Sequence, residues 1–150
     1  MTAIQDGEIL EILKERREHC RELLKLSRVQ RRLIDLDNYA GLLDVLGRKQ
    51  RILGSLDVLS RRHPELKEAW QANRATFDAG LREECEHVLA ETEALFAELL
   101  EEETGSTEHL TRRRDATRKQ LEAVSQGPQV HAAYRDSLAP STHRHLDVGQ

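Results

Sequence analysis

Apolar residues recur every three or four positions along most of the chain, which is the spacing of helices that each bury one face. The first such stretch predicts a helix over about residues 4–34, and the second predicts a helix over about 38–62. Between them, Asp35-Leu36-Asp37-Asn38 interrupts the pattern with side chains that compete for backbone hydrogen bonds and cap the following helix. We therefore expect two helices joined by a short turn.

A third helix is predicted over about 64–103, starting at His63-Pro64-Glu65, because proline is tolerated at a first helical position. At about 1.5 Å per residue it would be ~60 Å long, too long to wrap around a compact core. Thr104-Gly105-Ser106-Thr107 predicts a break or kink, followed by a fourth helix over about 108–125. Gly127-Pro128 ends that helix, and the rest of the chain is polar and interrupted by proline.

These elements predict an all-α fold: an elongated antiparallel hairpin or bundle of three long helices, a shorter C-terminal helix and a disordered tail. We expect one helical domain over residues 1–126 and a flexible tail over 127–150. The residues expected inside the bundle are Leu23, Leu46, Leu53, Trp70, Phe77, Leu81 and Val88.

Two features weaken the first two helices. Arg16 and His19 interrupt the apolar seam of the first, so its first half is expected to be loosely packed or to face a partner. The second contains Gly41, Gly47 and Gly54, and each glycine costs about 1 kcal/mol relative to alanine. At that spacing, the glycines could instead let a neighbouring helix approach closely.

The fourth helix carries a narrow apolar stripe, with Leu110, Leu121 and Val124 on one face of an otherwise basic and polar segment. Such a stripe buries too little surface to offset the ~1–2 kcal/mol per residue that ordering the segment costs. We therefore expect this segment to be mobile when free and ordered when a partner helix covers it.

Composition narrows the classes of function. A net charge of −4 and an aromatic content of 3% argue against a nucleic-acid partner, which calls for basic residues and stacking platforms. No apolar run approaches the ~18–20 residues that cross a bilayer, and the first residues lack the positive charge of a secretory signal. We therefore expect a cytoplasmic protein without membrane insertion. Cys20 and Cys85 could form one disulfide, but buried reduced thiols fit that compartment better.

Charge is distributed unevenly along the chain. Residues 83–103 contain nine glutamates and no lysine or arginine, whereas residues 14–32 contain eight basic residues. These stretches could be two solvated faces, because exposed ion pairs contribute little to stability. Alternatively, the first and third helices run parallel and the two stretches lie side by side.

No pattern for catalysis is present. The segment from Gly47 to Gly54 lacks the Gly-Lys-Ser/Thr ending of a phosphate-binding loop. Glu84 and His87 form a single Glu-x-x-His step, where a di-iron bundle needs two. His131, with His143-Arg144-His145, would bind a metal only incidentally. We therefore expect no enzyme activity, no catalytic residues, no metal site and no cofactor.

Three local stretches resemble the FlgN/FliT-type flagellar export chaperones. Arg48-Lys49-Gln50 followed by Ile52-Leu53 resembles the family's second helix, and Leu66-Lys67-Glu68-Ala69-Trp70-Gln71 resembles the entry to its third. The tail from Tyr134 to Ser141-Thr142-His143-Arg144 resembles the polar segment that follows a tyrosine in the family. The helix lengths and their order are also similar over most of the chain.

The resemblance implies a cytosolic chaperone that binds the helical C-terminal segment of hook–filament junction or cap subunits and delivers them to the type III export gate. It implies that Tyr134 contacts the export gate. It also implies a cargo-binding surface on the fourth helix, for which the candidate residues are Leu110, Arg114, Thr117, Leu121 and Val124. The alternative is a coiled-coil scaffold or adaptor with no secretion role, and the sequence leaves open whether the chain forms a homodimer.

Overall fold

The computed structural model describes residues 4–126, and every regular element in that range is helical. The predicted all-α class is therefore confirmed for this part of the chain. The predicted tail over 127–150, which includes Tyr134, lies outside the described residues. The elements are α1 (Asp6–Asp35), α2 (Tyr39–Arg62), α3 (Leu66–Asn73), the 3-10 turn η1 (Arg74–Thr76) and α4 (Ala79–Gln126).

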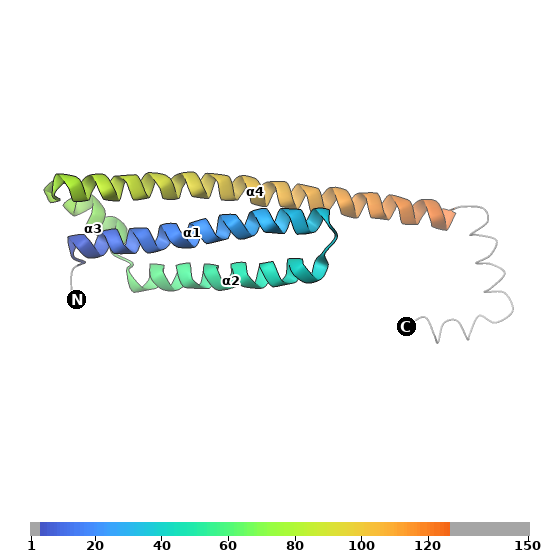
Figure 1. Cartoon of the computed structure of the whole chain (residues 1–150), viewed down its shortest axis with the longest axis horizontal. Helices are drawn as coiled ribbons and strands as arrows, with labels where there is room; N and C mark the ends of the chain where they lie inside the picture. The colour runs from blue at the N-terminus through green and yellow to red at the C-terminus, as the bar shows by residue number, and fades with distance from the viewer. Residues whose placement is uncertain (1–3, 127–150) are drawn as a thin grey trace. The chain divides into compact units, whose positions relative to one another are not determined.

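Within residues 4–126 the chain divides into two units, residues 4–108 and 109–126, with the boundary inside α4, and the single domain over 1–126 stays a prediction. Within the first unit, α1 lies alongside both α2 and the first part of α4 (Figure 1). The helix α2 runs antiparallel to α1, because the start of α1 packs near the end of α2. By contrast, α4 runs in the same direction as α1, since their contacts advance together along both sequences.

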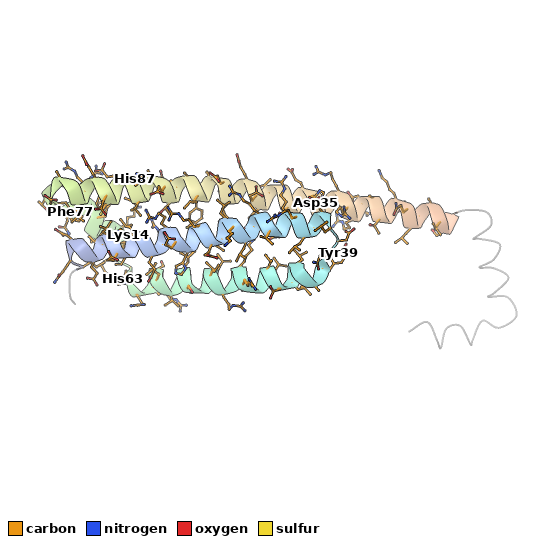
Figure 2. The ribbon with its side chains drawn as sticks, viewed as in Figure 1. Lys14, Asp35, Tyr39, His63, Phe77 and His87 are labelled. Carbon is orange, nitrogen blue, oxygen red and sulfur yellow. The ribbon has the colours of Figure 1, made fainter. Side chains whose placement is uncertain are left out.

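The turn between α1 and α2 forms at the predicted residues. Asp37 adopts a left-handed backbone conformation with φ of 54°, which reverses the chain within a few residues. The side chain of Asn38 then accepts a hydrogen bond of 2.9 Å from the backbone N–H of Gly41. The expected cap at the start of the second helix is therefore confirmed. Tyr39 and His63, labelled in Figure 2, mark the two ends of α2.

The predicted third helix over 64–103 is interrupted. The short α3 ends in η1, Phe77 is extended, and α4 starts after Asp78, whose carboxylate accepts a hydrogen bond of 3.4 Å from the N–H of Leu81. The ring of Phe77 packs edge-on against Trp70, with centroids 5.6 Å apart and an interplanar angle of 74°. This aromatic contact and the Asp78 cap together close a turn where the apolar pattern alone suggested an unbroken helix.

The predicted break at 104–107 does not occur, and the expected fourth helix over 108–125 is the end of α4. The hydroxyl of Thr107 donates to the backbone oxygen of Glu103 at 3.0 Å, so it supports the helix instead of capping a new one. Ser106 is buried at 1% exposure. A Cβ placed on Gly105 would lie 2.8 Å from Cζ of Arg31, which indicates that this glycine permits close approach of α1.

The interior of the first unit comprises two apolar clusters, one around Ile9, Phe77 and Val88 and one around Leu23 and Leu99. Of the residues predicted to be inside, Leu23, Phe77 and Val88 are buried, while Trp70 and Leu81 are half-buried against the first cluster.

The prediction was wrong for Leu46 and Leu53, which are 41% and 46% exposed. The reason lies in the rotation of α2 about its axis. The buried side chains of α2 are Leu42, Val45, Lys49 and Leu59, which recur on a neighbouring face of the helix. Because α1 and α4 supply polar partners for Lys49, this face can be turned inward although it contains a lysine.

Two glycines of α2 have no packing role in the described chain. A Cβ added at Gly47 or Gly54 would meet nothing within 4 Å, so the closely packed neighbour suggested by their spacing is not seen. We expect Gly47→Ala and Gly54→Ala each to raise the free energy of unfolding by about 0.5–1 kcal/mol, because alanine favours the helix. Urea denaturation followed by the fluorescence of Trp70, the only tryptophan, measures this for the first unit.

The matched control for these substitutions is Gly41→Ala. A Cβ there would lie 3.0 Å from the side chain of Asn38, within the helix cap, so no comparable gain is expected. A loss of stability in Gly47→Ala or Gly54→Ala would contradict the open space seen around these residues.

A candidate helix-binding surface on α4

The helix α4 contains a seam, a row of residues at steps of three and four that face one direction. In the first unit the members of this row are buried, and Cys85, Val88 and Leu99 belong to the two apolar clusters. The buried members are Cys85, Val88, Thr92, Leu99 and Ser106. The first part of α4 is therefore held in place by one periodic face.

The seam extends beyond residue 108 as Leu110, Arg114, Thr117, Leu121 and Val124, at steps of four, three, four and three. Because α4 is unbroken, all five predicted cargo-binding residues lie on one face of the helix. The apolar members are accessible: Leu110 is 39%, Leu121 65% and Val124 60% exposed. This face has the spacing of one strand of a coiled coil.

Positive charge flanks this exposed part of the seam. The segment 109–126 contains five arginine or lysine residues against Asp115 and Glu122. Arg114 and Arg118 both lie near Asp115, at 3.7 Å and 2.5 Å, and their side chains are largely exposed. A helix with acidic residues beside its apolar face would therefore match this surface in charge as well as in shape.

A ladder of ion pairs joins α1 to the first part of α4, so the two charged stretches lie side by side rather than on separate solvated faces. The pairs are Lys14–Glu84 at 3.7 Å, Arg17–Glu91 at 3.0 Å, Arg21–Glu91 at 2.8 Å, Arg28–Glu98 at 2.7 Å and Arg31–Glu102 at 3.4 Å. Lys14 and His87 are labelled in Figure 2 on the two helices that this ladder connects. Each exposed pair contributes little, but together they favour one direction and register of α4 against α1.

A polar cluster lies where α1, α2 and α4 meet. The Nζ of Lys49 donates to Oε1 of Gln30 at 2.7 Å and to Oε1 of Glu103, which also accepts from the hydroxyl of Ser27 at 2.6 Å. Ser27, Gln30 and Lys49 are all buried. Sequence reasoning missed this cluster, although its signal was present: Lys49 follows Leu42 and Val45 at the spacing of a buried face.

Two carboxyl groups of α4 have pKa values below the ordinary 4.5. Partial burial by itself raises the pKa of Glu91. The charges of Arg17 and His87, together with hydrogen bonds from Arg17 and Arg21, lower this pKa by more than burial raises it. For Glu103, burial is likewise outweighed by hydrogen bonds from Lys49 and Ser27 and by the charge of Lys49.

Because these pKa values are lowered on folding, their contribution to stability is full above pH 4.5 and is lost as the pH falls through the lower folded values. We expect the melting temperature of the first unit to decrease as the pH is lowered below about 4.5, and the melting temperature of Glu91→Gln to decrease less steeply. Thermal denaturation between pH 7 and pH 3 measures both. The control is Glu93→Gln, an exposed glutamate without an ion pair among residues 4–126, and an equal slope in both variants would contradict the expectation.

The cysteines and the Glu-x-x-His step, which are the candidates for redox or metal chemistry, are buried or paired with other side chains. Cys20 and Cys85 are buried free thiols, and burial raises the pKa of each, so neither is an activated nucleophile. Glu84 pairs with Lys14, whereas His87 lies 3.0 Å from Glu91, so the Glu-x-x-His residues have separate partners. Within the described residues, no group of three or more His, Cys, Asp or Glu side chains is placed to hold a metal ion.

Over residues 4–126, no helix combines the length and apolar character needed to span a bilayer. Comparison of the chain with protein-family models, with curated proteins and with solved structures finds no match.

Proposed function

We propose that this protein is a helix-binding chaperone whose α4 seam captures an amphipathic helix of a partner protein. The observation that carries the proposal is the seam itself, which is buried up to Ser106 and exposed at Leu110, Leu121 and Val124. Covering these side chains would gain ~25 cal/mol for each Å² of apolar surface removed from water. A partner helix with the matching spacing would complete a coiled-coil interface.

The resemblance to FlgN/FliT-type chaperones suggests the partner. In this proposal the seam binds the helical C-terminal segment of a flagellar hook–filament junction or cap subunit in the cytosol. The chain then delivers that subunit to the export gate, with Tyr134 as the contact residue. The basic flanks of the seam favour cargo segments whose apolar face is bordered by acidic residues.

Calorimetric titration tests this proposal directly. The full chain is titrated with synthetic C-terminal segments of junction and cap proteins, and with versions in which the same residues are shuffled. We expect saturable binding of a native segment with a negative heat-capacity change, because apolar surface is buried. Equal heats from native and shuffled segments would reject a sequence-specific cargo site.

A scaffold or adaptor is the second candidate, because α2 also presents an apolar surface. Leu43, Leu46, Leu53 and Val58 are 70%, 41%, 46% and 46% exposed. A scaffold would use such a surface to join copies of the chain or a second protein. Sedimentation equilibrium of the free chain separates the two candidates: a stable homodimer disrupted by Leu46→Glu would favour the scaffold.

A further inference from the structure

A second surface lies within residues 1–108, where two open cavities of about 390 and 880 Å³ meet. Both are lined by Arg16 of α1, by Lys67 and Trp70 of α3, and by Leu89 of α4. The larger cavity continues along α4 as far as Leu100. We name this surface the Trp70 groove; it shares no residue with the seam over 109–126.

The floor of the Trp70 groove is an uncovered helical face. Leu89, Phe96 and Leu100 follow one another on α4 at steps of seven and four, which places them on one side of the helix. Phe96 is 46% and Leu100 is 63% exposed, and Trp70 is only half-buried. Large apolar side chains that gather in a groove indicate a binding surface more strongly than scattered ones do.

The charges of the groove are unevenly placed. Arg17, Arg21, Arg28 and Arg31 all bond to glutamates of α4, whereas Arg16 forms no ion pair among the described residues. The Nε of Arg16 is buried and has no hydrogen-bond partner within residues 4–126. Because Arg16 lines both cavities, a ligand carboxylate that reaches the outer nitrogens of its guanidinium would pair with this charge and be stabilising.

The remaining charges give the groove two unlike walls. On the side of α1 and α3, Lys67 has no ion pair in the described part of the chain, and Arg74 lies over the ring of Trp70 at 5.8 Å. On the side of α4 are Glu93 and Glu86, of which Glu86 pairs with Arg82 at 3.7 Å. An occupant would therefore need acidic groups along one edge only.

The length of the groove indicates the kind of occupant. Its lining residues on α4 run from Glu86 to Leu100, which corresponds to about 21 Å, or four helical turns. We propose that the Trp70 groove binds an amphipathic helix of a partner protein that carries carboxylates along one edge of its apolar face. The apolar side chains of that helix cover Phe96 and Leu100, and one of its carboxylates accepts a hydrogen bond from Arg16.

Trp70 reports on this groove directly, because the chain contains one tryptophan. The probes are two tryptophan-free synthetic helices of about 15 residues, with the same leucines and either glutamate or lysine along one edge. On adding the glutamate-edged helix to the full chain, we expect a shift of the Trp70 emission to shorter wavelength. The lysine-edged helix should bind at least about tenfold more weakly, the scale of one charge-assisted hydrogen bond.

Three variants define the site. Arg16→Gln should weaken binding of the glutamate-edged helix about tenfold and leave the lysine-edged helix unaffected. Arg51→Gln removes an equal charge from an exposed position on α2 outside the groove and should change neither. Leu100→Asp should abolish binding of both helices, and its fold should persist because Leu100 is already exposed.

The proposal is overturned by any of four results. These are no binding of the glutamate-edged helix at about 1 mM, equal binding of both helices, an equal effect of Arg16→Gln and Arg51→Gln, and self-association of the free chain that Leu100→Asp removes. The last result would assign the groove to a second copy. Leu110→Asp with Leu121→Asp should leave binding in the groove unchanged, so failure of this site and failure of the α4 seam are distinguishable.

Discussion

Lys49→Met is expected to lower the free energy of unfolding of the first unit by about 2–3 kcal/mol. Methionine retains the length and apolar stem of the lysine but cannot donate to Gln30 or Glu103. The substitution leaves the carbonyl of Gln30, which is only 6% exposed, without its partner. It also leaves the charge of Glu103 partly buried, with only the hydroxyl of Ser27 beside it. Urea denaturation followed by Trp70 fluorescence measures the loss.

Two further variants show whether the loss arises from the unmatched partner. Lys25→Met makes the same chemical change at an exposed position of α1 and should alter stability by less than about 0.5 kcal/mol. Lys49→Met combined with Glu103→Met removes both charges, and it should be less destabilising than Lys49→Met alone. If Lys49→Met with Glu103→Met is at least as destabilising as Lys49→Met alone, Lys49 and Glu103 are not coupled and the cluster has no role in joining the helices.

Much of the fold could be predicted from local sequence. The period of the apolar residues located α1 and α2 to within about two residues, because each has one buried face and a recognisable end. Asn38 caps α2 as its side-chain chemistry suggests. Gly105 was misread because a glycine that ends a helix and a glycine that admits a neighbouring side chain look the same in sequence. Only the position of Arg31 distinguishes them.

Contacts between distant residues account for the other errors. The turn at Phe77 depends on Trp70, and the rotation of α2 depends on polar partners for Lys49 contributed by α1 and α4. Neither can be read from a single apolar pattern. The residues of the α4 seam over 109–126 are recognisable from their spacing, but the helix that contains them is not. The apolar pattern predicts these residues as the stripe of a short separate helix, whereas they lie in the last part of the long helix α4.

Leu110→Asp with Leu121→Asp is expected to weaken binding of a cargo helix at least about 100-fold. Each leucine that a partner covers contributes about 1.5–3 kcal/mol, and each aspartate adds a charge that would have to lose its water in the interface. The free protein should be little affected, because both leucines are exposed before binding. Calorimetric titration with the junction or cap segment measures the affinity, and the denaturation profile of Trp70 shows that the first unit remains folded.

The matched control is Ala116→Asp with Ala123→Asp, which adds the same two charges to the same segment of α4. Both alanines are exposed and lie off the seam, roughly 120–140° around the helix from it. The affinity of this variant for cargo should therefore lie within about threefold of that of the unsubstituted chain. This difference is the effect of two negative charges beside a basic surface. Equal weakening by both variants would show that binding depends on the net charge of the segment. Unchanged affinity in the leucine variant would place the cargo elsewhere, and the Trp70 groove, which Arg16 of α1 lines, would become the surface to test.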